Sequence, residues 1–408
     1  MTTKDSMCLI CYQIAFDKGS EYGSAYQIAQ YVVQKYPTLT LISRRKNIEL
    51  LKKDPLFEKS TLIALDVPEY LSFYKKKERG ITLYYLTWLY LVAKKVKSLG
   101  DFSLIYLVNF HGDKTPHFFK NPNGAVMWGP LAHHPFVPPE FIYQKPRILH
   151  IGFEYIKILT KKMLWYSPWM IKALKNSDII YHGNPNDLPP TFKWFSEKVK
   201  ILNVLARPFD VKTHTIPSQE GFRLLFIGRF IDVKGPIFAL HTFHEFYKTH
   251  PDAHLTMIGK GPLDEDLEAY IKTHGLEDAV EIINWLPQGD LFAHYQNAHI
   301  FFFPSMEAQG LVVTEAMQFG LPVMCLKTYG PHSIARDVAI SVPYQKGDIA
   351  STQKKLITAL SELYAIKDKP EYIELRKKTR KAYEEYQDAA QIASVILKDI
   401  ELLLNKSS

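Results

Sequence analysis

The stretch RLLFIGRFIDVKGPIFALHTFHEFYKTHPDAHLTMIGKG, residues 223–261, sets the pattern for the second half of the chain. An apolar run with strand character leads through glycine turns into an amphipathic segment at 236–250, and a second apolar run follows at 254–259. The alternation continues with expected helices over 261–275, 290–298 and 311–320 and expected strands over 280–286, 299–304 and 322–326. Strands that alternate with helices of this length predict a parallel sheet with right-handed crossovers.

The first half repeats this alternation less regularly. Expected strands cover 7–16, 39–44, 102–110 and 124–130, and expected helices cover 19–36, with Ser24 and Gln27 as a capping box, and 83–100. A stretch rich in Pro and polar residues at 187–219 predicts a domain boundary near 209–220. The fold class is therefore α/β, with two doubly wound Rossmann-like domains facing a cleft. The expected domains are 1–212, which would take the acceptor, 213–385, which would take the donor, and a helix at 386–408 that packs back on the first domain.

Composition excludes several classes of protein. The chain has 408 residues, 47% of them apolar, and no uncharged apolar run of about 18 residues, which predicts a globular protein without a membrane-spanning helix. The N-terminus lacks the pattern of a signal peptide, and with three cysteines we expect a cytoplasmic protein. Cys8 and Cys11 have CxxC spacing, but their apolar setting favours core packing over a metal site.

The net charge of +8 is spread as lysine pairs. Charge spread in this way usually lies on a solvated surface. It could also attract nucleic acid, an anionic membrane or an anionic substrate. No clustered reader motif for nucleic acid stands out, so we expect no nucleic-acid partner.

Charged residues follow the expected strands of the second half. Arg229 and Lys234 come after the first strand, and Glu307 and Glu315 flank the start of the helix at 311–320. Ligands of open parallel sheets bind outside the carboxyl ends of the strands, and a helix N-terminus suits phosphate. Eight helical steps span about 12 Å, so the two carboxylates could accept hydroxyls from a ribose and a hexose around a diphosphate. The alternative is that both are solvated helix residues.

Five motifs in order carry a family resemblance. GRFIDVKG (228–235), TMIGKGP (256–262), INWLP (283–287), FFFPSMEAQGLVVTEAMQFGLPV (301–323) and GPHSIARDVAISVP (330–343) resemble the donor domain of the retaining glycosyltransferases of family four, of the glycosyltransferase group 1 type, whose two-domain fold is called GT-B. In the first half, KGSEYGSAYQIAQYV (18–32), YYLTW (84–88) and VMWGPLAHHP (126–135) are similar to a subgroup with a Gly-Ser-Glu loop.

The resemblance implies site residues. Arg229 and Lys234 would hold the donor diphosphate, Glu307 would face the donor sugar, and Glu315 would hold the ribose. The other implied binding residues are Gly228, Trp285 and Leu286 beside the nucleobase, the backbone of Gln309, Gly310 and Leu311, and the loop of Gly19, Ser20, Glu21 and Gly23 that closes on the diphosphate.

The chain departs from the family pattern in four respects. Ala308 replaces a glycine, and Gln309 replaces a common aromatic residue. The Trp-Gly-Pro loop continues into His133 instead of glycines, which implies an unusual acceptor pocket. The family's His-x-His is replaced by Tyr106-Leu107-Val108, so that His111 is the candidate to assist catalysis.

The expected function is a retaining transferase that moves a sugar from a UDP- or GDP-sugar to a glycan or lipid-linked acceptor in cell-surface polysaccharide or lipopolysaccharide synthesis. No cofactor or metal is expected, because the cations would stabilise the leaving diphosphate and Asp264–Asp266 fall within a helix. Mixed Trp, Tyr and Lys at 86–97 and 161–175 leave open a peripheral contact with the inner face of an anionic cytoplasmic membrane. The alternatives are a phosphorylase or nucleotide-sugar epimerase on the same fold, and a basic nucleic-acid-binding protein that is not an enzyme.

Overall fold

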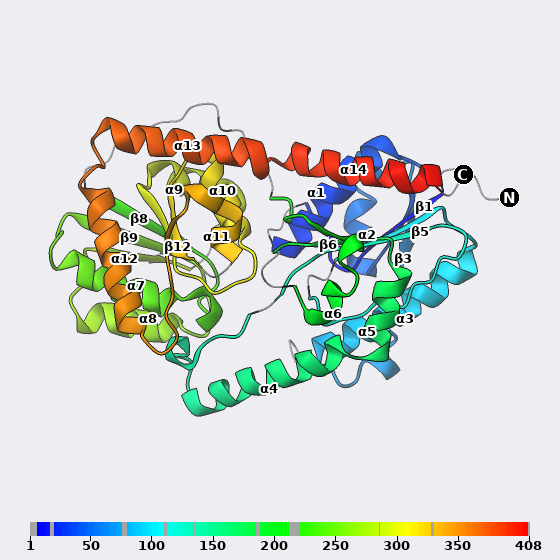
Figure 1. Ribbon diagram of the computed structural model, residues 1–408, viewed down its shortest axis with the longest axis horizontal. Helices are drawn as coiled ribbons and strands as arrows, with labels where there is room; N and C mark the ends of the chain where they lie inside the picture. The colour runs from blue at the N-terminus through cyan, green and yellow to red at the C-terminus, as the bar shows by residue number, and fades with distance from the viewer. Residues whose placement is uncertain are drawn as a thin grey trace. The chain divides into compact units, whose positions relative to one another are not determined.

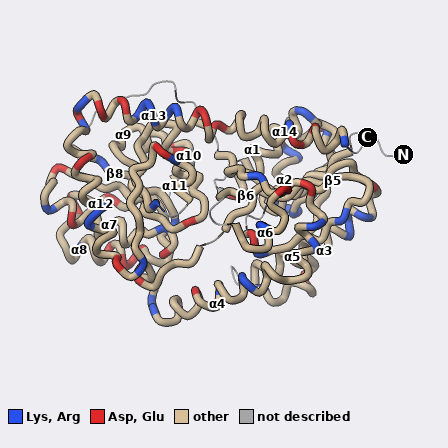
Figure 2. Tube along the Cα trace, in the orientation of Figure 1, with Lys and Arg blue, Asp and Glu red and all other residues tan. Residues whose placement is uncertain are grey.

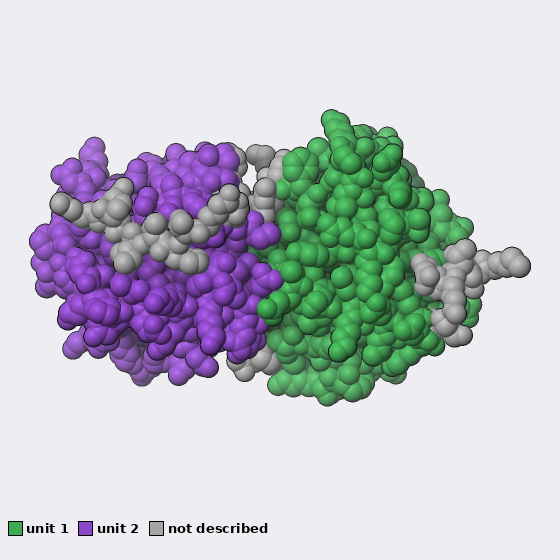
Figure 3. All heavy atoms as spheres, turned by 90° about the horizontal axis from the view of Figure 1, so that it is seen from above, with its two compact units in different colours: residues 1–133, 159–207, 389–408 green, residues 134–158, 208–388 purple. Residues whose placement is uncertain are grey.

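The computed structural model describes residues 6–16, 20–75, 80–109, 112–133, 135–184, 188–206, 208–209, 211, 221–284, 286–327 and 330–406. The chain divides into two compact units (Figure 3). Unit 1 comprises residues 1–133, 159–207 and 389–408, and unit 2 comprises residues 134–158 and 208–388. Residues 134–158 thus belong to unit 2, although they precede the boundary expected at residue 212. We call this segment the excursion.

Unit 1 is built on a seven-stranded sheet in the order β3-β2-β1-β4-β5-β6-β7 (Figure 1). The strands are β1 (Met7–Cys11), β2 (Thr40–Ser43), β3 (Thr61–Ala64), β4 (Leu104–Asn109), β5 (Ala125–Leu131), β6 (Ile179–His182) and β7 (Val199–Ile201). The helices are α1 (Ser20–Lys35), α2 (Arg45–Leu51), α3 (Ile81–Leu99), α5 (Pro168–Asn176), α6 (Pro190–Lys193) and α14 (Ala389–Lys406). Helix α4 (Arg147–Trp165) begins in unit 2 and ends in unit 1.

Unit 2 is built on a six-stranded sheet in the order β10-β9-β8-β11-β12-β13. The strands are β8 (Phe222–Ile227), β9 (Ala253–Ile258), β10 (Val280–Ile283), β11 (Ile300–Phe303), β12 (Val323–Leu326) and β13 (Ile340–Val342). The helices are α7 (Pro236–Tyr247), α8 (Asp264–Thr273), α9 (Leu291–Asn297), α10 (Leu311–Gln318), α11 (Gly330–Ala335), α12 (Ile349–Tyr364) and α13 (Pro370–Tyr386).

Neighbouring strands run parallel in both sheets. The strand order reverses direction between β1 and β4 in unit 1 and between β8 and β11 in unit 2. This reversal is the mark of a doubly wound sheet, and the prediction of two such α/β domains is confirmed.

Burial on both faces explains why the central strands are almost wholly apolar. In β1, Cys11 packs into one hydrophobic cluster and Cys8 into the cluster on the other side. The two thiols therefore point to opposite faces of the sheet, and burial raises the pKa of each above its usual value. The prediction that the CxxC spacing reflects core packing is confirmed.

The capping box predicted at Ser24 and Gln27 is wrong. Helix α1 already begins at Ser20, so Ser24 lies in its second turn and is buried there. Helix α14 packs against α1 and β4, and within unit 1 its Asp399 accepts a hydrogen bond from the Tyr181 hydroxyl at 2.8 Å.

Among the described residues, no helix combines the length and apolar character that crossing a bilayer requires.

Candidate active site

The carboxyl edge of the unit 2 sheet brings together most of the predicted donor residues. Gly228 and Arg229 follow β8, and Glu307 follows β11. These two strands are neighbours at the reversal of strand order, where open α/β sheets form their ligand crevice.

Lys234 and Glu307 form an ion pair at this edge. Their side chains are only 18% and 17% exposed. Burial raises the pKa of Glu307, while the charges of Lys234 and then Arg229 oppose that rise. The second carboxylate oxygen, Oε1, is buried and accepts no hydrogen bond from the described residues. The pair therefore holds a carboxylate with an unused acceptor beside a cation.

A tight turn places Lys234 against Glu307. Gly235 has φ +69° and ends the short 3-10 turn Asp232–Lys234, and a Cβ at Gly235 would lie 2.8 Å from the carbonyl oxygen of Pro304. The Met306 N–H donates to the carbonyl of Val233 at 2.9 Å. The loop after β11 is thus fastened to the turn after β8, and the ion pair follows from this backbone contact.

Two other close backbone contacts shape the same edge. A Cβ at Gly259 would lie 1.9 Å from the carbonyl oxygen of Gly228, so the loops after β8 and β9 approach as closely as glycine permits. A Cβ at Gly330 would lie 2.2 Å from the carbonyl oxygen of Ala308. The Gly330 N–H donates to the Glu307 carbonyl at 2.9 Å, which fixes the Glu307–Gln309 segment on α11.

Arg229 differs from Lys234 in its surroundings. Its side chain is exposed, and it forms no ion pair with the part of the chain that the structure describes. Its charge nevertheless acts on Glu307. A solvent-facing guanidinium near a paired lysine leaves donors available for an anion.

Glu315 lies inside α10 and is 6% exposed. Its Oε2 accepts a hydrogen bond from the Tyr295 hydroxyl at 2.8 Å. Burial, and then the charge of Glu315, raise the pKa of Tyr295 well above its usual value, so the phenol remains a donor. Glu315 is therefore held by the core of unit 2, and the alternative of a solvated helix residue is wrong.

The remaining donor-side residues surround the start of α10. Gln309 and Leu311 are half-buried, and Gly310 is buried. A Cβ at Gly310 would lie 3.2 Å from Glu307 Oε1. The Gln309 side-chain nitrogen is buried without a partner among the described residues. Leu286 is half-buried against the core of unit 2, and Trp285 lies outside the described residues.

In unit 1, His133 follows β5 and lies in a polar cluster that the sequence did not predict. Its Nδ1 is 3.0 Å from Asp113 Oδ2 and 3.4 Å from Lys161 Nζ, and its ring stacks on Trp165 with 5.3 Å between centroids. Asp113, Lys161 and the nearby His182 are buried, whereas the His133 side chain is 18% exposed. Burial lowers the pKa of His182 to about 4, which keeps it neutral.

The structure describes only some of the other site residues predicted in unit 1. Glu21 and Gly23 are half-buried in the first turns of α1, and Ser20 opens that helix. Gly19 and His111 lie outside the described residues. Asp113 could have been predicted, because it follows β4 at the sheet edge. Lys161 could not, because it lies in helix α4 and does not follow a strand.

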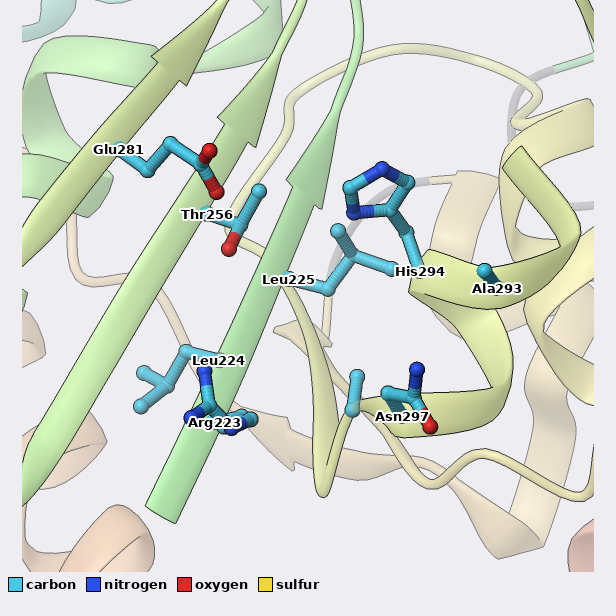
Figure 4. Close-up of a pocket in the computed structure, with 9 residues that line it drawn as sticks. Arg223, Leu224, Leu225, Thr256, Glu281, Ala293, His294 and Asn297 are labelled. Carbon is cyan, nitrogen blue, oxygen red and sulfur yellow. The ribbon is translucent and has the colours of Figure 1, made fainter. Parts of the chain in front are cut away.

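A hollow of about 200 Å³ lies elsewhere in unit 2 (Figure 4). Arg223 lies near the amino end of β8, Thr256 and Glu281 come from the bodies of β9 and β10, and His294 and Asn297 come from α9. None of the predicted site residues that the structure describes lines it, and Lys234 and Glu307 are not among its lining residues.

Part of this chain is similar to known glycosyltransferases. Residues 209–383 match the family model described as glycosyl transferases group 1. An uncharacterized glycosyltransferase of Haemophilus influenzae is 27% identical over 55% of this chain and 55% of its own length. The chain spans about half or less of the length of the first curated relatives that it matches.

Solved structures share the whole fold. HepE of Anabaena, solved with UDP, aligns with a TM-score of 0.60 and 13% identity over 98% of this chain and 100% of its own. WaaG, a glycosyltransferase involved in lipopolysaccharide biosynthesis, aligns with a TM-score of 0.62 and 16% identity over 97% and 99%. At such low identity these alignments establish the fold alone, which is the two-domain GT-B fold. Residues 209–383, which contain Arg229, Lys234, Glu307 and Glu315, are therefore the part of the chain that is similar to the glycosyl transferases group 1.

Proposed function

We propose that the protein is a retaining, metal-independent glycosyltransferase that moves a sugar from a UDP- or GDP-sugar to a glycan or glycolipid acceptor. The observation that carries the proposal is the group of Arg229, Lys234, Glu307 and Glu315 on one sheet edge, within the part of the chain that matches the family model. The printed names of the relatives support the donor and acceptor classes, since HepE was solved with UDP and WaaG acts in lipopolysaccharide biosynthesis.

Each residue has a chemical task in this proposal. Lys234 has three N–H donors, so it can keep Glu307 and still donate to a diphosphate oxygen. Arg229 adds a second cation for the negative charge that grows as the bond between the anomeric carbon and the phosphate oxygen breaks. Glu307 Oε1 would accept a hydroxyl of the donor sugar, and Glu315, steadied by Tyr295, would accept ribose hydroxyls.

The acceptor hydroxyl would attack the same face of the sugar that the diphosphate leaves. Its oxygen bonds to the anomeric carbon, the electron pair of the broken bond goes to the diphosphate, and the departing phosphate oxygen takes the proton. The two protein cations would supply the charge stabilisation that a metal supplies in other transferases. Unit 1, with the partly exposed His133, is proposed to bind the acceptor.

The roles of the two carboxylates can be separated by calorimetry. Glu315→Gln is expected to weaken binding of both UDP and the nucleotide sugar by about 10- to 150-fold, because charge-assisted hydrogen bonds contribute about 1.5–3 kcal/mol. Glu307→Gln is expected to bind UDP almost normally and to lose affinity or rate with the intact donor. Equal losses for both ligands in both variants would indicate damage to α10, and a UDP defect confined to Glu307→Gln would reverse the assignment.

A phosphorylase on the same fold would require inorganic phosphate as acceptor, so turnover that depends on phosphate would favour that alternative. An epimerase would change the donor sugar without releasing UDP. A role in binding nucleic acid is not favoured, because Lys and Arg are scattered over both units instead of forming one stripe (Figure 2).

We also propose that the protein binds the surface of an anionic membrane through α4. This helix turns charged residues inward, where Glu154 pairs with Lys157 and accepts a hydrogen bond from the Val137 N–H. Its outer side is apolar, with Ile148 85%, Leu159 62% and Met163 68% exposed. The exposed apolar residues of α4 are Ile148, Leu149, Phe153, Tyr155, Ile156, Leu159 and Met163. Lys162, exposed beside them, suits anionic headgroups.

Vesicle binding tests the α4 surface. Phe153→Glu combined with Leu159→Glu is expected to lower partitioning onto vesicles of phosphatidylglycerol and phosphatidylcholine by on the order of 100-fold, since burying one such side chain contributes about 1.5–3 kcal/mol. The matched control, Phe73→Glu with Leu402→Glu, adds the same charge at exposed apolar residues outside α4. Equal partitioning of both double variants and the unmodified protein in a sedimentation assay would rule out this surface.

A further inference from the structure

A second group of cations lies in unit 1, next to the carboxyl ends of β1 and β2. Arg44 directly follows β2 and is only 8% exposed. Its Nε donates to the carbonyl of Tyr12, just after β1, at 3.0 Å, and its guanidinium carbon lies 4.2 Å from the centre of the Tyr12 ring. The strand order of unit 1 reverses beside β1, so Arg44 lies near the position where a doubly wound sheet binds its ligand.

Two lysines lie near Arg44, each beside a tyrosine ring. Arg44 Nη2 donates to the Tyr22 hydroxyl at 3.3 Å, and Lys46 Nζ lies 5.7 Å from the centre of the Tyr22 ring. On the other side, Lys75 Nζ lies 4.1 Å from the centre of the Tyr84 ring. The Tyr84 and Tyr12 ring centres are 6.4 Å apart. Arg44, Lys46 and Lys75, called here the unit 1 cations, therefore surround one group of aromatic rings.

The positive charge of this group acts on its own members. Burial, and then the charges of Arg44 and Lys46, lower the pKa of Lys75. Burial by itself would raise the pKa of the Tyr22 hydroxyl, but hydrogen bonds and charges from Arg44 and Lys46 lower this pKa below its usual value. Asp66, the carboxylate that acts on Lys75, already accepts a hydrogen bond from the Arg45 N–H at 3.2 Å. Like charges that are held together in this way favour an anion between them.

We propose that the unit 1 cations form an anion site, distinct from the donor residues of unit 2, that binds a phosphate group carried by the acceptor. Naming the ligand as the acceptor rests on the proposed function, whereas the anion site itself does not. A guanidinium can bind two phosphate oxygens at once, the lysines add charge, and the Tyr22 hydroxyl adds a donor. A phosphate suits three cations better than a carboxylate does, because it carries more charge and more acceptor oxygens.

The test uses the full chain with its donor site already filled. With UDP at saturation, glucose 6-phosphate is titrated into the protein and binding is followed by calorimetry. Lys46→Ala combined with Lys75→Ala is expected to weaken this binding by at least about tenfold, since charge-assisted hydrogen bonds are lost, while UDP affinity stays unchanged. Arg44 is left intact because its buried guanidinium also supports Tyr12. Lys52→Ala with Lys53→Ala, which removes the same charge from exposed lysines of unit 1, is the matched control.

The outcomes separate the possible sources of the phosphate. Binding of glucose 6-phosphate that depends on Lys46 and Lys75 supports a phosphorylated sugar. Loss of binding to phosphatidylglycerol vesicles in the same double variant, with no effect on glucose 6-phosphate, supports a lipid phosphate. The proposal is overturned if saturating UDP abolishes binding, if the double variant loses UDP affinity, or if the control and the double variant behave alike. If UDP itself does not bind, the proposed function fails, and titration of the UDP-free protein still tests the unit 1 cations.

Discussion

Arg229→Ala is expected to lower the rate of sugar transfer by about 100- to 1,000-fold, the usual cost of removing one donor aimed at charge that develops in the transition state. The unfolding temperature should not change, because the Arg229 side chain is exposed and forms no ion pair among the described residues. Release of UDP from the nucleotide sugar, measured with and without EDTA, provides both the rate and a test of metal dependence.

Lys272→Ala is the control for that experiment, because it removes an exposed cation from α8 in the same unit. A near-normal rate in Arg229→Ala would show that this guanidinium does not face the diphosphate. Loss of activity in EDTA that Mg²⁺ or Mn²⁺ restores would instead show that a metal carries the charge.

Lys234→Ala is expected to lower both the stability of the protein and the rate of transfer, whereas Arg229→Ala is expected to lower the rate alone. Removing one member of a buried ion pair costs about 3–5 kcal/mol, and the lower end is expected here because both side chains retain some exposure. Lys234→Met combined with Glu307→Gln should recover most of the stability, since neither charge is then buried, but it should not recover transfer. Urea unfolding monitored by circular dichroism measures the first effect, and UDP release measures the second.

The pH dependence of the Lys234→Ala defect identifies its cause. Burial already raises the pKa of Glu307, and removing Lys234 takes away the charge that opposes this rise. A carboxyl with a raised pKa in the folded state is most stabilising below its pKa in the unfolded chain, and this stability is lost as the pH rises through the folded value. The loss of unfolding free energy caused by Lys234→Ala should therefore be largest at high pH and become smaller as the pH falls. A deficit that does not vary with pH would mean that Lys234 supports the fold through packing.

The sequence predicted unit 2 better than unit 1 for a physical reason. Strands such as β11, read from the run IFFF, are buried on both faces and bounded by clear turns. In unit 1, the strand β3 is half-exposed, and β7 has three residues, so neither has a distinct apolar signal. Helix α4 has an apolar side at helical spacing, as a core helix has, but the sequence cannot show that this side faces outward.

The candidate site shows the same division. Strand ends located Arg229, Lys234 and Glu307, since the carboxyl edge of a parallel sheet can be inferred from the order of elements. The pairing of Lys234 with Glu307 depends on how the Gly235 turn meets Pro304, a contact that sequence spacing does not contain. Arg44 and Lys46 belong to the basic run Arg44-Arg45-Lys46, which the sequence shows, but Lys75 and the tyrosines come from distant elements, so spacing alone does not reveal that these side chains gather.

The excursion of residues 134–158 has a consequence for how the chain can be divided. The polypeptide passes between the two units at residues 133/134, 158/159, 207/208 and 388/389. Phe141, from this excursion, is fully buried in the core of unit 2, 5.0 Å from Phe238 and 5.2 Å from Tyr344 between ring centres. A fragment cut once between the halves would therefore lack part of its own interior. Neither unit is one continuous stretch of sequence, and moving unit 2 into another chain would require residues 134–158 together with residues 208–388.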